Sequence, residues 1–193
     1  MPSLFHTLRR LTLVAIAAMT WSGAIAAPAA AQQNGYTMEE IVAQGHNFFG
    51  STSGGLATLI EKAFQQYGLP NGYILGEEAS GAFIGGLRFG EGTLFTKNAG
   101  EHRLFWQGPS FGFDAGGDGA RTMMLVYDLP SVESVYGRFG GVTGTAYLVG
   151  GIGMTLLTRD DIKIVPVKTG IGARLGINIG YLKITPMPTW NPF

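Results

Sequence analysis

Glycine at alternate positions constrains this chain more than any other feature of its sequence. Of its 31 glycines, 24 lie in the 122 residues from Gly72 to the C-terminus. In residues 169–185, bulky apolar side chains alternate with glycine, arginine or asparagine. Successive side chains of a strand point to opposite faces, so one face of such a strand is apolar and the other is nearly bare. Glycine weakens a strand, and its repetition indicates strong coiling of the sheet or close approach to that face. A small closed barrel requires both.

Turn signals divide the chain after Gly72 into eight to ten candidate strands. The predicted strands are 73–75, 82–88, 93–98, 103–107, 110–115, 121–127, 146–149, 154–158, 162–167 and 169–185. The predicted turns are 90–92, 98–100, 116–119 and 159–161, and a short helix capped by Ser131 or Asp128 is predicted within 130–136. We therefore expect a mainly β fold, a small soluble barrel of about eight strands that is closed or nearly closed, with N-terminal helices.

Two helices are expected before the barrel. Thr37 and Glu40 have the spacing of a capping box, which predicts a helix from Met38 to about Phe48. A second helix is predicted over Leu56–Tyr67, where the apolar residues share one face. Packing of this face against the barrel is the favoured interpretation, and docking of another protein is the alternative. The proline-rich C-terminal segment is expected to be extended. The candidate partner-docking residues are Leu56, Phe64, Trp190 and Phe193.

The first 31 residues resemble a secretory signal peptide. Arg9 and Arg10 precede an apolar run of about 15 residues, and small residues follow, with cleavage expected before Gln32 or, as the alternative, before Ala27. We expect three parts: a signal peptide (1–31), a helical segment (32–70) and a glycine-rich barrel (71–193). Without the signal peptide, 11 basic and 13 acidic groups remain, a net charge of −2. No later segment has 18 consecutive apolar residues. A periplasmic protein that is not integral to a membrane is therefore predicted.

Several classes of function find no support in the sequence. There is no cysteine, so disulfides, thiol nucleophiles and cysteine-liganded metals are excluded. Only His46 and His102 follow the signal peptide, and no serine-hydrolase elbow is present. Glu77 and Glu78 are adjacent on a predicted strand, so they face opposite ways and form no catalytic pair. The balanced charge argues against a nucleic-acid partner. We expect no enzyme activity, no cofactor and no metal.

Three arginines lie in or beside apolar strand sequence. They are Arg88, Arg121 and Arg174. Each could point outward or pair with an acid such as Asp114, Asp128 or Glu91. The alternative is contact with an anion inside a mostly apolar site, for example a lipid headgroup. With Trp106, these arginines are the candidate ligand-binding residues.

Five segments in the same order resemble one family. They are residues 72–83, 106–110, 121–127, 176–183 and 189–193. Together they are similar to the envelope integrity protein A (EipA) family over residues 36–193. The resemblance implies a soluble periplasmic barrel of about eight strands with N-terminal helical material. It also implies a role in envelope integrity and stress resistance, with no catalytic residues. Residues 108–184 also resemble the SYLF module, which implies affinity for lipids.

These observations predict a non-catalytic periplasmic protein that supports the cell envelope. A lipid-like or apolar ligand, or another envelope component, is the candidate partner. The alternative is a structural module that binds an envelope protein and holds no small molecule.

Overall fold

Two helices precede the strands, as the sequence predicts. The computed structural model describes residues 34–50, 54–81, 86–109, 120–169 and 180–191, which belong to one unit, Gln32–Phe193. Helix α1 is Met38–Phe49 and α2 is Leu56–Tyr67. The capping box is present: Thr37 N donates to Glu40 Oε2 at 2.7 Å, and Glu40 N donates to Thr37 Oγ1 at 3.3 Å. These two bonds satisfy donors that the start of a helix leaves unpaired.

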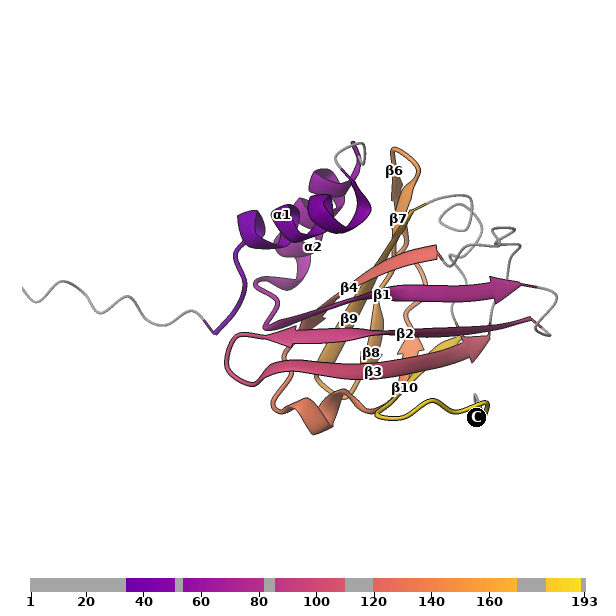
Figure 1. Ribbon diagram of the computed structural model, residues 1–193. Coiled ribbons are helices and arrows are strands. Elements are labelled where there is room, and N and C mark those ends of the chain that lie inside the picture. Colours follow the sequence, from indigo (N-terminus) through magenta and orange to yellow (C-terminus); the bar gives the residue numbers. More distant parts are fainter. Residues whose placement is uncertain (1–33, 51–53, 82–85, 110–119, 170–179, 192–193) are drawn as a thin grey trace, which may run out of the picture. The chain divides into compact units, whose positions relative to one another are not determined.

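Ten antiparallel strands follow in the described part of the chain. They are β1 (Gly72–Gly81), β2 (Leu87–Thr96), β3 (Gly100–Pro109), β4 (Ala120–Tyr127), β5 (Gly137–Gly141), β6 (Tyr147–Val149), β7 (Ile152–Met154), β8 (Leu157–Arg159), β9 (Ile162–Thr169) and β10 (Tyr181–Thr185). A 3-10 helix, η2 (Val132–Val135), lies between β4 and β5. Figure 1 shows both α-helices on one side of the strands.

Eight of these strands form a closed ring. The order is β4-β1-β2-β3-β10-β5-β8-β9, and β9 pairs again with β4 to close it. The remaining two strands extend from the ring, because β7 pairs with the end of β9 and β6 pairs with β7. The expected small β-barrel of about eight strands is thus confirmed.

Alternation along the strands separates two apolar clusters. We call the first the interior cluster, because it contains a residue from every ring strand, which only the inner face of the barrel brings together. Its members are Ile74, Leu94, Leu104, Trp106, Met124, Val126, Leu129, Val135, Phe139, Leu157, Ile162, Ile164, Leu182 and Ile184. The second, the helix-side cluster, joins α1 and α2 to the outer face of β1, β4, β7 and β9. Tyr73 belongs to the helix-side cluster and its neighbour Ile74 to the interior cluster.

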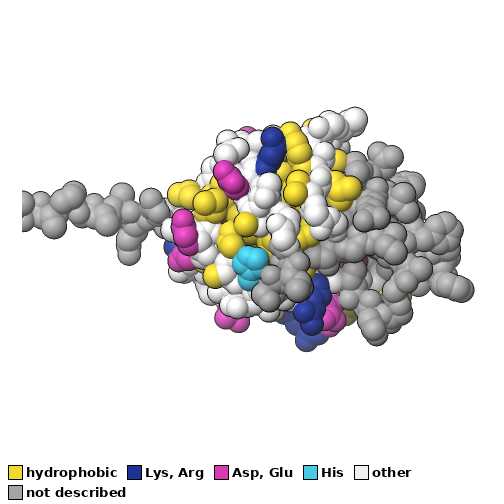
Figure 2. Space-filling model, turned by 90° about the horizontal axis from the view of Figure 1, so that it is seen from above, with side chains coloured by type: hydrophobic (Ala, Val, Ile, Leu, Met, Phe, Trp, Pro, Cys, Tyr) yellow, Lys and Arg dark blue, Asp and Glu magenta, His cyan; other side chains and the backbone are white. Residues whose placement is uncertain are grey.

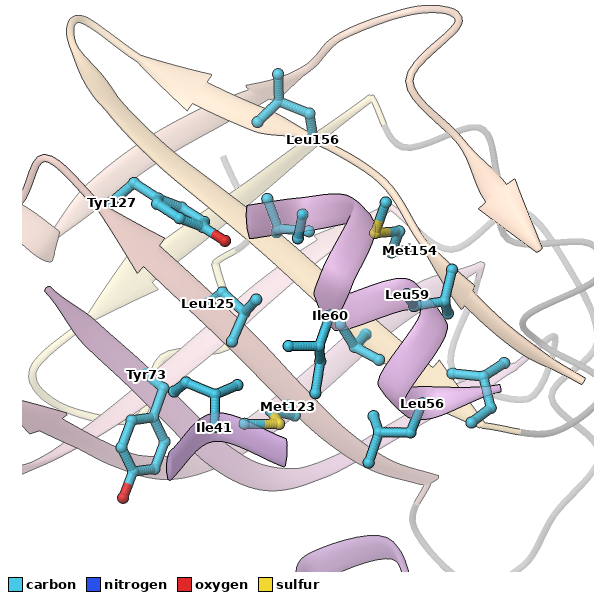
Figure 3. Packing of buried hydrophobic residues seen from close by; sticks show 14 residues of the cluster. Ile41, Leu56, Leu59, Ile60, Tyr73, Met123, Leu125, Tyr127, Met154 and Leu156 are labelled. Atoms are coloured by element: carbon cyan, nitrogen blue, oxygen red, sulfur yellow. The ribbon is translucent and has the colours of Figure 1, made fainter. Parts of the chain in front are cut away.

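The apolar face of α2 is covered by the barrel. Leu56, Leu59 and Ile60 are at most 1% exposed and pack with strand residues such as Met123 and Met154 (Figure 3). Burial of these apolar side chains stabilises the folded protein by about 25 cal/mol for each Å² of apolar surface removed from water. The favoured interpretation of this helix, packing against the main domain, is confirmed.

The segment between β4 and β5 closes one end of the barrel. Leu129 and Val135 belong to the interior cluster. Asn71 holds the start of this segment, because its Nδ2 donates to Leu129 O at 2.8 Å and its Oδ1 accepts from Leu129 N at 3.1 Å. The short helix predicted here is present, and Ser131 is its N-cap residue. The interior is therefore apolar at this end.

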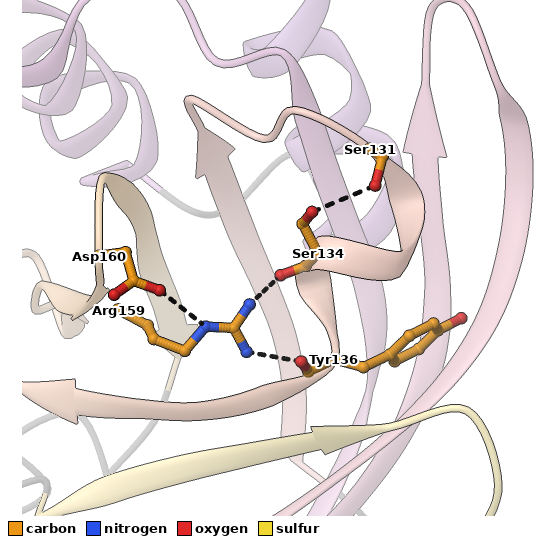
Figure 4. Close-up of polar contacts among 5 residues, drawn as sticks. All are labelled: Ser131, Ser134, Tyr136, Arg159 and Asp160. Atoms are coloured by element: carbon orange, nitrogen blue, oxygen red, sulfur yellow. Dashed lines mark hydrogen bonds and ion pairs between the residues drawn. The ribbon is translucent and has the colours of Figure 1, made fainter.

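Arg159 fixes η2 to the barrel wall (Figure 4). Its guanidinium donates to the carbonyl oxygens of Ser134 and Tyr136. The guanidinium also lies 4.7 Å from the centroid of the Phe139 ring. Gly137 has φ +143°, and a Cβ there would lie 1.7 Å from Arg159 Nη1, so only glycine fits beside this arginine.

We expect Arg159→Met to lower the free energy of unfolding by about 1–3 kcal/mol, because two carbonyl groups lose a charged donor. Urea denaturation measures this loss. Asp160→Asn is the matched control: Asp160 is next in sequence, its side chain is 86% exposed and its Oδ2 lies 3.8 Å from Arg159 Nε. The control should stay within about 0.5 kcal/mol of the wild type. Equal losses in the two variants would show that Arg159 does not hold η2.

Several boundaries differ from the sequence prediction. The turn predicted at 90–92 is wrong, because these residues continue β2 opposite β1 and β3. The strand β5 was not predicted, since three of its five residues are glycine. The single strand predicted at 154–158 is interrupted between β7 and β8. The turns at 98–100 and 159–161 are confirmed by the pairing of the flanking strands. The predictions for 110–115, 116–119 and 170–179 lie outside the described residues.

Candidate functional site

A buried charged cluster occupies the interior at the end opposite η2. Glu78 is 3% exposed and lies in β1, two residues beyond Gly76 on the inward face. Its Oε2 accepts from Trp106 Nε1 at 2.8 Å, and its Oε1 pairs with Lys168 Nζ across β4. Burial opposes ionisation of Glu78, yet the charges of Lys168 and Arg88 outweigh this effect and lower its pKa below the usual value. Glu78 is therefore a buried carboxylate.

Two glycines make room for the indole of Trp106, and a third allows β1 and β2 to approach closely. A Cβ on Gly90 would lie 2.2 Å from Trp106 Cε2, and one on Gly76 would lie 2.7 Å from the same ring. A Cβ on Gly92 would meet the backbone of β1, with Leu75 O at 2.4 Å. Real side chains do not approach so closely, so glycine is required at these positions. The glycine-rich face of β1 and β2 thus faces the interior and seats a tryptophan.

Arg88 lies beside this cluster on the inward face of β2. It is 4% exposed, and its Nη2 donates to Tyr181 O at 3.2 Å. Within the described ranges, its Nε is buried and has no hydrogen-bond partner. Neither of the described acids considered for Arg88 forms an ion pair with it: Glu91 pairs with Arg103, and Asp128 pairs with Lys163. Those two pairings are therefore corrected, and Asp114 lies outside the described residues.

A second feature is a groove on the outer face of β1, β2 and β3. Its volume is about 660 Å³, and the C-terminal residues 188–190 line one side of it. Phe89 and Phe105 contribute aromatic rings to the lining, and the Trp190 ring lies 5.1 Å from that of Phe89. Arg103 and Glu91 form an ion pair of 2.9 Å in the same groove. The groove thus combines an apolar lining with a charged pair, as small-molecule sites do.

Hydrogen bonds hold the C-terminal segment in this position. Thr185 Oγ1 donates to Met187 O at 2.8 Å, and Lys183 Nζ donates to Asn191 O at 3.2 Å. Gln107 lies in β3 and donates from Nε2 to Thr185 Oγ1 at 3.5 Å. No helix forms in residues 186–191, as the prolines predict. Trp190 remains 84% exposed above the groove.

The structure brings together two of the four predicted ligand-binding residues. Arg88 and Trp106 both face the interior and lie around Glu78. Arg121 instead faces outward and donates to Phe48 O at 2.7 Å, so it does not join them. Arg174 lies outside the described residues. Of the two alternatives given for the arginines, Arg121 follows the one in which the side chain points outward.

The predicted docking residues have different environments. Leu56 is fully buried, so the docking role considered for it is withdrawn. Phe64 is partly buried against the helix-side cluster. Trp190 is exposed, and Phe193 lies outside the described residues. Seen from above, apolar side chains of the described residues are scattered among polar ones and charges of both signs (Figure 2).

The sequence analysis did not identify Glu78 and Lys168 as members of the buried charged cluster. The signal was present: Glu78 shares the inward face of β1 with Ile74, and Lys168 shares that of β9 with Ile164. Phe89 and Phe105 of the groove were also missed. They are brought to one surface by the pairing of β2 with β3 and by the C-terminal segment, which strand periodicity does not reveal.

Among the described residues, no helix has the length and apolar character needed to cross a bilayer. No three histidine, aspartate or glutamate side chains of these residues lie close enough together to hold a metal ion.

Comparisons with known proteins agree with the fold. The family model described as envelope integrity protein A (EipA) matches residues 34–193. A crystal structure of a β-barrel-like, uncharacterised protein from Brucella abortus is 66% identical, with a TM-score of 0.79. The similarity covers 83% of this chain and 99% of that one. A search of curated proteins gives no match. The similarity of residues 108–184 to the SYLF module stays a prediction. Because the family model spans most of the sequence, this chain belongs to the envelope integrity protein A family.

Proposed function

We propose that this protein is a non-catalytic periplasmic protein that supports cell-envelope integrity by holding a lipid-like, apolar ligand in the groove of β1, β2 and β3. The family name supports the envelope role. The observation that carries the ligand is the groove itself, with its volume of about 660 Å³ and its aromatic lining. Pockets of this size, apolar with a few polar groups, are typical binding sites for small molecules.

The groove fits one end of an amphiphile better than a fully polar molecule. Phe89, Phe105 and Trp190 offer ring faces to an acyl chain, and burial of that chain supplies the driving force. The ion pair of Arg103 and Glu91 gives polar partners for a headgroup. Because these charges are exposed, they orient the ligand more than they strengthen its binding.

The C-terminal segment supports a second candidate function. Met187 is 71% exposed and Trp190 is 84% exposed, the two highest values among the large apolar side chains of the described residues. Exposed apolar side chains close together are typical of protein–protein contacts. The candidate is a structural module that docks an envelope protein on this segment. Crosslinking in intact cells from positions 187 and 190 would trap a discrete protein adduct if this candidate is right.

Removal of the gene tests the envelope role. A deletion strain should become more sensitive to detergent and to antibiotics that the envelope excludes. Wild-type protein and the Met187→Ala variant should restore resistance, and Trp190→Ala should restore it less well. Unchanged sensitivity of the deletion strain would contradict the envelope role. Solvent extraction of the purified exported protein, followed by mass spectrometry, should release a stoichiometric apolar compound.

Trp190→Ala should weaken the binding of the neutral dye N-phenyl-1-naphthylamine by about 2–10-fold, because one aromatic wall of the groove is lost. Stability should change little, since the side chain is 84% exposed. A fluorescence titration measures the dye affinity. Met187→Ala is the matched control, because Met187 is exposed on the same segment but does not line the groove. Equal affinity in both variants would place the dye elsewhere.

A further inference from the structure

Among the described residues, the charges around Trp106 do not balance. The described interior layer contains two cations, Arg88 and Lys168, and one carboxylate, Glu78. Lys168 pairs directly with Glu78. No carboxylate of the described residues lies within ion-pair distance of Arg88. The described part of this layer therefore has two positive charges and one negative charge, a net charge of +1. A buried charge without a partner is costly, and such groups are normally paired.

The unmet hydrogen bond lies on the same arginine. Arg88 is 4% exposed and makes one hydrogen bond within the described residues, from Nη2 to Tyr181 O. Its Nε is shielded from solvent and has no acceptor there. Guanidinium groups bind oxyanions through two adjacent N–H donors, of which Nε–H is often one. An excess positive charge and an unused donor thus coincide on one side chain.

We propose that the polar end of the barrel interior binds an oxyanion, a carboxylate or phosphate group, through Arg88 Nε and the positive charge shared by Arg88 and Lys168. Glu78 positions this site, because it holds Lys168 and Trp106 in place. The anion is either free in solution or the headgroup of an amphiphile. Glu78 and Trp106 also line the groove of β1, β2 and β3, but Arg88 does not, and Trp190 lines only the groove. Arg88→Met therefore tests the interior site, and Trp190→Ala tests the groove.

Isothermal titration calorimetry on the exported protein tests this site with two probes, inorganic phosphate and dodecyl phosphate. Dodecyl maltoside serves as the neutral amphiphile. We expect wild-type protein to bind dodecyl phosphate, and Arg88→Met to lower that affinity about tenfold or more, since a hydrogen bond to a charged group is lost. Arg121→Met is the matched control, because Arg121 is exposed on the outer face of β4 and should bind like the wild type.

Each outcome has a distinct meaning. Binding of inorganic phosphate as well as dodecyl phosphate, both weakened by Arg88→Met, supports a site for free anions. Binding of dodecyl phosphate alone, weakened in the same way, supports a headgroup site. An anion carried through purification would appear in native mass spectrometry as an added mass in the wild type and in Arg121→Met, absent from Arg88→Met. No binding and no added mass in the wild type, or equal affinity in Arg88→Met, would overturn the proposal.

Stability without the anion separates this role from a structural one. Arg88→Met leaves the pair of Glu78 and Lys168 neutral, so its melting temperature in phosphate-free buffer should equal or exceed that of the wild type. A strongly lowered melting temperature would instead make Arg88 a structural counter-charge for Glu78 and overturn the proposal. If Arg88→Met does not fold, Arg88→Lys keeps the charge but lacks Nε. It should then fold and still lose affinity for the anion.

Discussion

Glu78→Gln should lower the free energy of unfolding by about 3–5 kcal/mol, the cost of leaving a buried charge without its partner. The substitution keeps an oxygen that can accept from Trp106 Nε1 and hardly changes the shape of the side chain. The loss of stability therefore measures the removal of the negative charge. Lys168 and Arg88 would then keep their positive charges in the interior without the carboxylate with which both interact electrostatically. Urea denaturation followed by circular dichroism measures the effect.

Glu77→Gln is the control for this result. Glu77 is adjacent in β1 but exposed on the outer face, so its substitution should change stability by no more than about 0.5 kcal/mol. Similar losses in both variants would show that the interior position of Glu78 is unimportant.

The same carboxylate predicts the dependence of stability on pH. The pKa of Glu78 is lowered in the folded protein, so the folded pKa lies below the unfolded value of about 4.3. Its stabilisation is complete above the unfolded pKa and is lost as the pH falls through the folded pKa. The difference in stability between wild type and Glu78→Gln should therefore be constant near pH 7 and shrink below about pH 4. A difference that is unchanged at pH 3 would contradict an ionised Glu78.

Trp106→Ala should cost about 3–5 kcal/mol, because it removes a fully buried indole from the interior cluster. Gly90→Ala should also destabilise, by about 1–3 kcal/mol, since its Cβ would overlap the indole at 2.2 Å. In the double variant the alanine at 90 enters the space that Trp106 vacates. The two losses should therefore combine to less than their sum, with a coupling of about 0.5–3 kcal/mol.

Gly140→Ala is the control for the glycine substitution. Gly140 lies in β5, and a Cβ there would have its nearest neighbour at 4.0 Å, Thr158 O. This variant should lie within about 0.5 kcal/mol of the wild type. Strict additivity of Gly90→Ala and Trp106→Ala would show that the glycine does not serve to seat the indole.

The sequence predicted the architecture better than the site, for a physical reason. Capping of α1 depends on Thr37 and Glu40, which are three residues apart, and such local rules can be read directly. The glycine excess pointed to coiled strands or close approach. Gly90 and Gly92 were nevertheless predicted as a turn, because the groups that require them lie on other strands: the indole of Trp106 for Gly90 and the backbone of Leu75 for Gly92.

The candidate sites depend still more on distant contacts. The alternation that includes Ile164 and Lys168 predicts that both face the same way, but not that Lys168 reaches Glu78, 90 residues away. The groove needs the C-terminal segment folded back toward β2, which its prolines alone do not direct. The sequence analysis named Arg88 together with two other arginines in similar apolar sequence. The strand register places Arg88 on the inward face and Arg121 on the outward face, and the sequence alone does not distinguish the two.

The strand order also determines when the chain can fold. β10 is the last strand made, yet it lies between β3 and β5 in the ring. Pairing of β3 with β10 joins residues 76 to 80 positions apart, from Gln107 and Lys183 to Phe105 and Thr185. Barrels dominated by such distant pairings fold in milliseconds to seconds, more slowly than helical bundles. Until the C-terminus has emerged, β3 and β5 keep unpaired edges, and growing chains are at risk of intermolecular association through them. Truncation before β10 should therefore cause aggregation during synthesis rather than yield a smaller stable barrel.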